Sequence, residues 1–461
     1  MGPHTGAWTD SPNQEVPLEG LEPPTLSLGR NCSSIELQRR LAKSSEPPLS
    51  HVLTSLFTVK IYLASLGSRG DNEPFLALAE EASLAGHEVY FAHTSDVASD
   101  IDALFDELEL PGSMEKVIAD QGSSALRALL NYRTVMKPLL EGVWNRSTQQ
   151  IVDLRPDVVV YHPKVVTAAT AAHAVGALAA EVEIVPTMTP TAEFPPAGLP
   201  LTPPARWNQA SYTLMKAGLS SFAPVLDELA GRLGVIRTDS DLVLCPVSPT
   251  LVPPPTDWPD FAHITGQWHS HSEESPDAEL EDFLHSGSVL YAGFGSMRDA
   301  RGAARAHAIV AAARSRGLKT LLTTGWGGLE PSAEHQRASD VVIRESVPHG
   351  SVLPRVEVAI HHGGAGTTHA CVRSGTPSLI MPFLGDQPWW AARLHAQGLG
   401  PRALRRGETR VSVIARAIDD ALSRRSRVQR ASQDMAREDG LAAALAILED
   451  AEAGVAALRP A

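Results

Sequence analysis

Hydrophobic residues in the first half of the chain occur in short continuous runs separated by a segment with helical spacing. The run 57-FTVKIYLASLG-67 stops at glycine, 74-PFLALAEEASLAG-86 has the spacing of an amphipathic helix, and 87-HEVYFAHT-94 is a second apolar run. Strand, helix and strand in such close succession predict a βαβ unit, and therefore a parallel sheet. The runs 157-DVVVYH-162 and 182-VEIVPT-187, on either side of an Ala-rich helical segment, extend this sheet.

The same pattern restarts in the second half of the chain. The run 288-SVLYAGFGS-296 ends in glycine and precedes the helical segment 303-AARAHAIVAAARSRG-317. Strands are predicted at 318–325, 341–346, 356–362 and 378–383, and helices at 367–375 and within 410–449. The fold class is therefore α/β, with two doubly wound Rossmann-like domains. Ligands of such sheets bind at the carboxyl ends of the strands, so a deep cleft between the domains is the expected site.

Proline and polar content divide the chain into regions. Residues 1–55 are rich in Pro, Ser, Gly and charge, and we expect a disordered N-terminal extension there. Residues 56–245 form the N-terminal domain. Residues 246–268 form an interdomain linker, because six prolines between residues 246 and 259 exclude helix and central strand. Residues 269–461 form the C-terminal domain with its terminal helices.

Composition and charge narrow the possible partners. The chain has 461 residues, 43% of them hydrophobic, and a formal net charge of −14. An acidic surface repels nucleic acid and anionic membranes, so neither is an expected partner. Cys32, Cys245 and Cys371 lie far apart, and no apolar stretch reaches the length of a membrane span. We therefore expect a cytoplasmic protein without integral membrane association, acting as a monomer or homodimer.

Glycines follow one of the predicted strands in the stretch 360-IHHGGAGTTHA-370. Free backbone N–H groups and the positive end of the next helix suit an anion such as a phosphate, which small residues allow to approach. The letters match neither GxGxxG nor GxxxxGK(S/T). A metal site at His361 and His362 is disfavoured, because adjacent strand residues point to opposite faces. A glycine-rich turn with one core histidine is the structural alternative.

A second polar stretch, 382-PFLGDQPWWAARL-394, places Asp386 and Gln387 directly after the next predicted strand. A carboxylate beside an amide offers acceptors and donors that match the hydroxyls of a sugar. The alternative is a turn that caps the helix beginning near Pro388. The two stretches together therefore favour a ligand that carries both phosphate and sugar.

The run HHGGAGTT…GTP…PFLGDQPWW, with VPHGSVLP ahead of it, resembles the nucleotide-sugar-dependent glycosyltransferases of the GT-B fold. Within them the likeness is to the family-1 branch that holds bacterial antibiotic (natural-product) glycosyltransferases and sterol glucosyltransferases. The segment 64-ASLGSRGDNEPFLALAEEASLAGHEVYFA-92 is similar to the first strand, loop and helix of that branch. The resemblance covers roughly residues 57 to 400.

The resemblance implies a donor site in the C-terminal domain for a UDP- or dTDP-sugar as co-substrate. Trp326 would shield the nucleobase or, equally, serve as a packing tryptophan, and Arg69 would contact phosphate or brace its loop in an ion pair. A tryptophan that stacks on the base in plant relatives is replaced by Ser346. The implied donor-binding residues are Ser68, Arg69, Ser296, Trp326, Val347, His362, Gly363, Gly364, Ala365, Gly366, Thr367, Thr368, Asp386 and Gln387.

The resemblance also implies the catalytic base. Relatives that glycosylate small molecules often carry Gly-His-x-x-Pro after the first strand, and 70-GDNEP-74 puts Asp71 at the position of that histidine, as in the sterol and antibiotic branch. An exposed aspartate is a weak base, so we expect burial to raise the pKa of Asp71. Glu73, a second carboxylate nearby, could raise it further. The alternative role of Asp71 is an N-cap for the helix starting at about Pro74.

Acceptor contacts are expected from the N-terminal domain. The segments 120–144 and 187–200 carry apolar and aromatic residues that suit a lipophilic natural product or sterol-like alcohol, with an aminoglycoside-type acceptor as the alternative. The candidate residues are Glu73, Tyr132, Met136, Trp144 and Phe194. The motif 239-DSD-241 is similar to the metal-binding DxD of the other major glycosyltransferase fold, but it is interpreted as a solvated turn. No metal and no cofactor are expected.

The predicted function is an inverting glycosyltransferase that moves a sugar from a UDP- or dTDP-sugar to a hydroxyl of a lipophilic small molecule. Two other classes remain open. A sugar-nucleotide epimerase or hydrolase could use the same fold, and a non-catalytic homologue could act as the partner of another transferase. The presence of Asp71, His362, Asp386 and Gln387 disfavours the non-catalytic class.

Overall fold

The structure is a computed structural model. It describes residues 58–95, 104–113, 136–199, 203–220, 222–270, 275–295, 297, 300–325 and 328–456. The expected N-terminal extension and three candidate site residues, Tyr132, Ser296 and Trp326, lie outside these ranges. In the part of the chain that is described, no helix combines the length and the apolar character that crossing a bilayer requires.

The first sheet has seven parallel strands among the described residues, in the order β3-β2-β1-β4-β5-β6-β7. Its central strands are buried on both faces, which explains their continuous apolar sequences. The strands are β1 (Lys60–Ala64), β2 (Glu88–His93), β3 (Asp106–Glu109), β4 (Val158–Tyr161), β5 (Leu178–Val182), β6 (Leu242–Cys245) and β7 (Ala262–Ile264).

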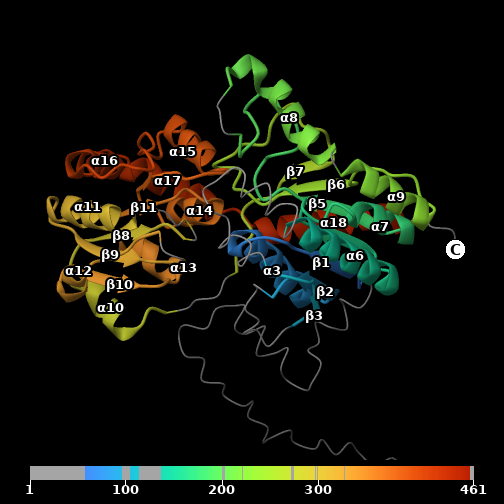
Figure 1. The fold of residues 1–461 in the computed structure, drawn as a ribbon, viewed down its shortest axis with the longest axis horizontal. Coiled ribbons are helices and arrows are strands. Elements are labelled where there is room, and N and C mark those ends of the chain that lie inside the picture. The colour runs from blue at the N-terminus through green and yellow to red at the C-terminus, as the bar shows by residue number, and fades with distance from the viewer. Residues whose placement is uncertain are drawn as a thin grey trace, which may run out of the picture. The chain divides into compact units, whose positions relative to one another are not determined.

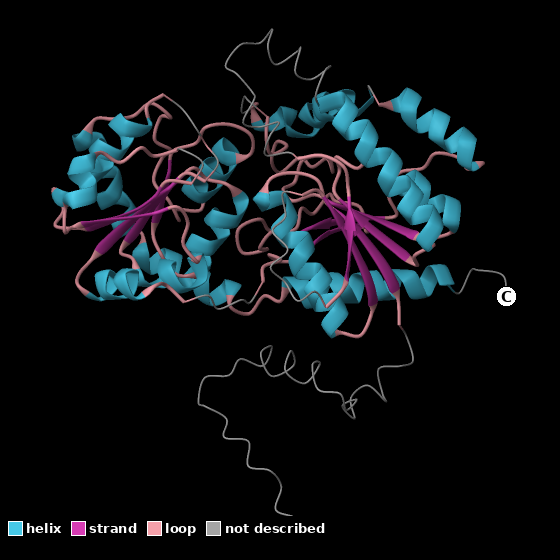
Figure 2. Cartoon of the chain, turned by 60° about the horizontal axis from the view of Figure 1, so that its bottom comes forward, coloured by secondary structure: helices cyan, strands magenta, loops and turns pink. Residues whose placement is uncertain are grey.

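Helices cover both faces of this sheet (Figure 2). One face packs against α3 (Arg69–Leu84), and the other packs against α6 (Lys137–Leu154) and α7 (Ala168–Val175). Further helices follow β5 in the chain, namely η2 (Ala205–Trp207), α8 (Asn208–Ser220) and α9 (Ala223–Leu233).

The second sheet has five parallel strands among the described residues, in the order β10-β9-β8-β11-β12. Helices α11 and α16 pack on one face, and α10, α13 and α14 on the other. The strands are β8 (Val289–Gly293), β9 (Lys319–Thr323), β10 (Val341–Arg344), β11 (Val358–His361) and β12 (Ser378–Ile380). The helices are α10 (Ala278–His285), α11 (Gly302–Arg314), α12 (Ala333–Arg337), α13 (His349–Val352), η3 (Leu353–Arg355), α14 (Ala365–Arg373), α15 (Gln387–Ala396), α16 (Val411–Ser423) and α17 (Arg425–Met435). The expected α/β class is confirmed.

The last helix, α18 (Gly440–Ala456), packs on the first sheet although it follows the second in sequence. Leu441, Leu445 and Leu448 are buried in the same cluster as Phe75 of α3. Figure 1 shows this red helix among the blue and green elements. The boundary expected at 269–461 therefore does not describe α18, because its apolar face completes the core of the first sheet.

The segment expected to be a linker, 246–268, is built into the fold. It contains β7, and Val247 and Leu251 are fully buried in a cluster with Trp390 of α15. The prolines do exclude helix there, but apolar residues between them fill a core. The expected linker is therefore a packed connection.

Two element boundaries differ from the prediction for local reasons. The strand expected at 182–187 is β5, which ends at Val182, because α7 already stops at Gly176 in a left-handed conformation with φ of 76°. The helix expected to begin at about Pro74 begins at Arg69, with Ser68 as its N-cap. The proline lies inside the helix, and the capping group is the Asp71 carboxylate three residues after Ser68.

Candidate active site

The first sheet changes direction between β1 and β4. Chain connections run outward from β1 to β2 and β3 on one side, and from β4 to β5 on the other. Such a switch point leaves a crevice beyond the carboxyl ends of the two strands, which is where doubly wound sheets bind ligands. The loop after β1 leads to Asp71, and the loop after β4 begins with His162 and contains Lys164.

The Asp71 carboxylate accepts four hydrogen bonds at this switch point. Its Oδ2 accepts from the Ser68 N–H at 2.7 Å and from the Ser68 hydroxyl at 2.9 Å. Its Oδ1 accepts from His162 Nε2 at 3.1 Å and from Lys164 Nζ at 3.1 Å. The candidate base is thus held from two loops that lie more than ninety residues apart in sequence.

The tautomer of His162 follows from its other nitrogen. Nδ1 faces the Lys164 backbone N–H at 3.1 Å and therefore accepts, so Nε2 carries the proton and donates to Asp71. Burial lowers the pKa of His162, so the ring is neutral near pH 7. His162 has no free lone pair in this arrangement and orients the carboxylate without competing as a base.

The pKa of Asp71 moves in the opposite direction to the prediction. Burial alone would raise this pKa, as expected from the sequence. The charge of Lys164 and the hydrogen bonds from His162 and Ser68 outweigh burial and hold the pKa well below its usual range. The expectation of a raised pKa is therefore wrong for the ligand-free chain.

Arg69 and Glu73 pair with each other on the exposed side of α3. Arg69 Nε lies 2.5 Å from Glu73 Oε1, and the two side chains are 80% and 52% exposed. An ion pair this exposed contributes little stability. Both residues belong to α3, so this pair joins two turns of the helix rather than bracing the loop, and phosphate contact by Arg69 and acceptor contact by Glu73 stay predictions.

The second sheet has its own switch point, between β8 and β11. Gly295 follows β8 and His362 follows β11, and the two meet: a Cβ on Gly295 would lie 3.4 Å from the His362 ring. On the other side of the ring, a Cβ on Gly364 would lie 2.5 Å from His362 Nε2. Gly363 adopts φ of 93°, a left-handed conformation that favours glycine. The glycines therefore make room for the histidine as well as for a ligand.

Helix α14 begins directly after these glycines. The amides of its first turn, at Ala365, Gly366 and Thr367, precede the first intrahelical bond, which Thr368 N–H donates to Gly364. These amides and the helix dipole are suited to an anion. A strand end, glycines and a helix start thus lie where the sequence predicts a cradle, and binding of an anion there stays a prediction.

Three buried polar atoms beside α14 make no hydrogen bond to any described residue. They are Nε2 of His361, Nδ1 of His362 and Oγ1 of Thr368. Burial lowers the pKa of His362 to about 4, against a smaller opposing effect of the Gly293 carbonyl, and burial also holds the pKa of His361 well below its usual range. Leaving buried polar groups unpaired costs about 1–3 kcal/mol each, so a ligand that supplied partners would bind favourably here.

Asp386 and Gln387 lie in the loop after β12. Asp386 Oδ2 accepts from the Trp390 indole at 3.0 Å, and burial, with a contribution from the charge of Asp71, raises the pKa of Asp386 to about 6. Gln387 is buried, and its Oε1 accepts from the N–H groups of Phe383 at 2.7 Å and Leu384 at 3.2 Å. Gln387 therefore shapes its own loop, and contact of either side chain with a sugar stays a prediction.

Charges at the two switch points influence each other. The carboxylate of Asp71 acts on Asp386, and the charge of Arg69, after burial, helps to lower the pKa of His349 to about 4. His349 is the first residue of α13 and bonds the Tyr291 hydroxyl at 3.0 Å. Val347, two residues earlier, is partly buried against the cluster that contains Tyr291. Residues at the first switch point are thus within electrostatic reach of Asp386 and His349, which follow strands of the second sheet.

Comparisons with known proteins agree with this geometry. Residues 334–445 match the family described as erythromycin biosynthesis protein CIII-like, C-terminal domain. The calicheamicin glycosyltransferase CalG4 is 18% identical, with a TM-score of 0.64 over 88% of this chain and 100% of that one. The glycosyltransferase SnogD from Streptomyces nogalater is 20% identical, with a TM-score of 0.60 over 87% and 100%. These likenesses show that the two sheets have the GT-B fold.

Sequence relatives are sterol glucosyltransferases. The chain is 28% identical over 416 residues to a sterol 3-beta-glucosyltransferase of Arabidopsis thaliana, covering 84% of this chain and 64% of the relative. It is 27% identical over 445 residues to that of Cryptococcus neoformans, covering 86% of this chain and 27% of the relative. The chain is thus similar over most of its length to sterol 3-beta-glucosyltransferases, and it shares the GT-B fold with the solved glycosyltransferases. It spans about two thirds of the plant relative and about a quarter of the fungal one.

Aromatic residues that were expected to line the acceptor site of this chain have other contacts. Trp144 is 4% exposed and donates its indole N–H to the Lys164 carbonyl at 2.8 Å. Phe194 is also 4% exposed and packs edge-on against Trp389 of α15, while Met136 packs against the core of the first sheet. Contact of these three side chains with an acceptor stays a prediction, and their packing roles were not expected.

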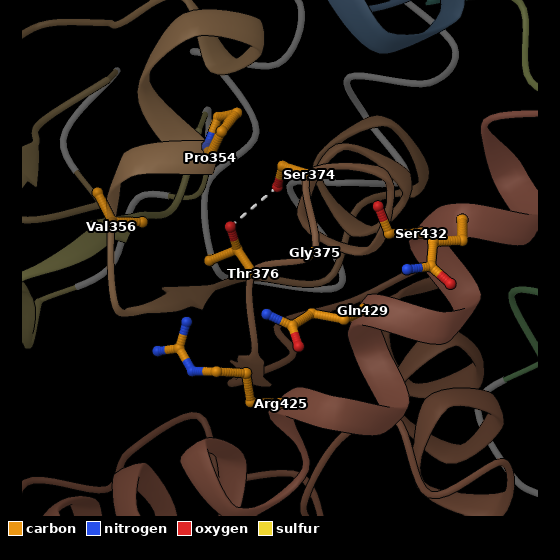
Figure 3. A pocket seen from close by; sticks show the side chains of 9 residues that line it. Pro354, Val356, Ser374, Gly375, Thr376, Arg425, Gln429 and Ser432 are labelled. Carbon is orange, nitrogen blue, oxygen red and sulfur yellow. Dashed lines mark hydrogen bonds between the residues drawn. The ribbon is translucent and has the colours of Figure 1, made fainter.

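Two other features lie away from the GT-B switch points. A cavity of about 440 Å³ is lined by Val356, Ser374, Thr376, Arg425 and neighbours (Figure 3). Val356 directly precedes β11, and Ser374 and Thr376 directly precede β12, so the cavity is at the amino ends of these strands, opposite His362. Asp241 of the DxD-like motif directly precedes β6, at the amino ends of the strands of the first sheet. It accepts hydrogen bonds from His173 and from the Ala179 N–H. Within the described ranges, no cluster of three or more His, Cys, Asp or Glu is arranged to hold a metal.

The residues that sequence reasoning missed are His162 and Lys164. Both follow the buried strand 157-DVVVYH-162, and polar residues directly after a buried strand are the signal that could have found them. The missing information was that β4 lies beside β1, because strand order is not visible in the sequence.

Proposed function

We propose that this chain is an inverting glycosyltransferase that moves a sugar from a UDP- or dTDP-sugar to a hydroxyl of a lipophilic small molecule. The observation that supports it most is the pairing of two switch points. One carries a carboxylate held by a neutral histidine and a lysine, and the other carries an anion cradle with unpaired buried donors. A base and a leaving-group site within electrostatic reach are what sugar transfer requires.

The proposed reaction has one displacement step. Asp71 takes the proton of the acceptor hydroxyl as its oxygen bonds to the anomeric carbon, and the bond from that carbon to the donor diphosphate breaks. The leaving diphosphate carries the negative charge, which the first-turn amides of α14 and His362 stabilise. Attack from the face opposite the leaving group inverts the anomeric centre, so an α-linked donor gives a β-glycoside.

The lipophilic acceptor is supported by relatives rather than by a lined pocket. The curated relatives are sterol 3-beta-glucosyltransferases, and the structural neighbours include an antibiotic glycosyltransferase. The segment 120–144 of the expected acceptor region is only partly described, from residue 136 onward. We therefore propose a hydroxylated polycyclic or macrocyclic compound as acceptor.

The decisive experiment compares wild-type protein with Asp71→Asn. UDP-glucose and dTDP-glucose are each supplied with cholesterol and with a panel of polyketide and macrolide alcohols, and the glycoside is measured by mass spectrometry. Because a general base contributes about 10²–10⁴-fold, transfer by Asp71→Asn should fall by about that factor. UDP affinity, measured by calorimetry, should stay within about twofold, since that binding uses the second switch point. Full transfer by the variant would disprove the base assignment.

Controls separate the other classes. Incubation with UDP-glucose alone reveals a hydrolase or epimerase, because glucose or a second sugar nucleotide then forms without acceptor. Binding of UDP without turnover of any acceptor or donor would favour the non-catalytic partner. Transfer to an aminoglycoside but not to the lipophilic alcohols would contradict the acceptor class only.

A further inference from the structure

Lys164 combines a fixed backbone with a mobile side chain. Its N–H donates to His162 Nδ1 at 3.1 Å, and its carbonyl accepts the Trp144 indole N–H at 2.8 Å. Its side chain is 42% exposed, and the ammonium lies 3.1 Å from Asp71 Oδ1. The ammonium can therefore swing away from Asp71 while the backbone that orients His162 stays in place.

The carboxylate of Asp71 has no vacant acceptor position in this arrangement. An ionised carboxylate offers about four lone-pair sites, and the four donors described above fill two on each oxygen. An acceptor hydroxyl must donate a hydrogen bond to the base before it gives up the proton. One of the four donors therefore has to leave before the proposed reaction can begin.

The four donors differ in how easily they leave. The Ser68 N–H and hydroxyl belong to the N-terminal cap of α3, so their loss would unravel the start of that helix. His162 is 7% exposed and locked by the Lys164 backbone. The Lys164 ammonium faces solvent, and a pair with this exposure is worth about 0–1 kcal/mol. Lys164 is thus the donor that leaves at the lowest cost.

We propose that the Lys164 ammonium occupies the place on Asp71 Oδ1 that the acceptor hydroxyl takes, and that acceptor binding displaces it. Lys164 is then a positioning residue that keeps the carboxylate ionised and ordered in the free chain. This inference rests on the proposed function, because it assigns the acceptor-hydroxyl subsite of the same base. The subsite is the position beside Asp71 Oδ1 that the Lys164 ammonium occupies.

Departure of the ammonium also changes the chemistry of the base. Removing a positive charge from beside a carboxylate makes the carboxylate bind a proton more readily. The other titratable groups that act with Asp71 are His162 from the β4 loop and Asp386 from the second sheet, and the charged neighbours on its own helix are Arg69 and Glu73. Arg69 and Glu73 pair with each other, His162 is neutral, and Asp386 would further favour a protonated Asp71. The proton taken from the acceptor oxygen rests on Oδ1 and passes to water after the glycoside leaves.

The test compares Lys164→Met with the charge-preserving control Lys164→Arg. The assay follows kcat/KM from about pH 4 to 9 with UDP-glucose and the best acceptor of the panel. Hydrolysis of UDP-glucose, with water in the acceptor place, gives a second profile. The wild-type acid limb lies below this pH range, and in Lys164→Met it should move up into the range, because an opposite charge at this distance shifts a carboxyl pKa by about 1–3 units. In Lys164→Arg the acid limb should stay where it is in the wild type.

Two further readouts exclude a merely structural role. The acceptor KM of Lys164→Met should fall by about 2- to 5-fold at pH 8, since a competitor worth up to about 1 kcal/mol is gone. UDP affinity and the midpoint of thermal unfolding should match the wild type in both variants, because the side chain is exposed and touches the first site only.

Three outcomes would overturn the inference. Loss of transfer by Lys164→Met at every pH with UDP affinity intact would mean that the ammonium is needed in the transition state. Weaker UDP binding with an unmoved acid limb would make Lys164 a donor ligand. An inactive Asp71→Asn beside an unchanged Lys164→Met profile would reject this inference alone, whereas an active Asp71→Asn would reject the proposed base itself.

Discussion

The two switch points have the same topology and opposite states of hydrogen bonding. At the first, between β1 and β4, every lone-pair site of the Asp71 carboxylate has a donor within the chain. At the second, between β8 and β11, buried atoms of His361, His362 and Thr368 make no hydrogen bond to any residue in the described ranges. The first site is complete without a ligand, and the second is not.

This difference assigns a separate task to each sheet. Preorganised, unpaired donors are suited to binding an anion, because no internal bond has to break first. A fully bonded carboxylate is suited to storing a reactive group in one orientation, because reaction must first remove a partner. Binding of the donor should therefore depend on the second site, and the rate of transfer on the first.

The largest effect that we expect from this division of tasks is on UDP affinity. His362→Ala removes the buried imidazole beside the α14 cradle, and hydrogen bonds to charged groups are worth about 1.5–3 kcal/mol. We expect UDP to bind about 10- to 100-fold more weakly by calorimetry. Asp71→Ala is the matched control at the other switch point and should change UDP affinity by less than about twofold. Equal losses of UDP affinity in the two variants would show that binding of the donor depends on both sites.

The effect of intermediate size is on the free energy of unfolding at acid pH. Groups at the two sites should lose their contributions to it in different pH ranges. Burial lowers the pKa of His349, His362 and His369 to about 4 from the ordinary 6.5, so the unfolded chain binds more protons between these values. Stability is then lost as pH falls from about 6.5 to 4, by about 1–2 kcal/mol per histidine at pH 5. The pKa of Asp71 is lowered, so its contribution is lost only below about pH 4.

Urea unfolding at pH 7 and pH 5 measures this loss. The raised pKa values of Asp386 and Glu181 increase the stability as the pH falls, but these two groups oppose three histidines. Replacement of His369 by Asn should shrink the difference between the two pH values, whereas Asp71→Asn should leave it unchanged. Identical stability at pH 7 and pH 5 in the wild type would contradict the prediction.

The smallest expected effect tests how the backbone of Lys164 is held at the first site. Trp144→Phe keeps an aromatic ring but removes the N–H that donates to the Lys164 carbonyl. This loss should lower the free energy of unfolding by about 0.5–1.5 kcal/mol. Transfer should fall less than about threefold, and UDP affinity should not change. Trp389→Phe, which loses the bond to the Pro195 carbonyl at 3.0 Å, is the matched control. A larger loss of transfer from the control than from Trp144→Phe would argue against anchoring of Lys164.

Sequence patterns predicted the parts of this fold that depend on nearby residues. The apolar runs ending in glycine identified β1, β8 and β11, and the glycines after β11 indicated the anion cradle. The acidic strand β3, with the sequence DELE, was missed because it lies at a sheet edge and has little apolar pattern.

The parts that depend on distant residues could not be predicted. Asp71 was found from its motif, but the direction of its pKa shift depends on His162 and Lys164, which reach it only because β4 lies beside β1. The same limit hid the packing of α18. Its helical character was expected, but nothing in the sequence says which of two similar sheets its leucines contact.

The return of α18 to the first sheet has a consequence for how the chain folds during synthesis. The ribosome completes the first sheet early, yet one face of its core still lacks Leu441, Leu445 and Leu448 until the 17 residues of α18 emerge. Each missing leucine is worth about 1.5–3 kcal/mol of burial, so the nascent first half is incomplete throughout translation of the second. Of the two sheets, the one made first is therefore the one whose core is completed last.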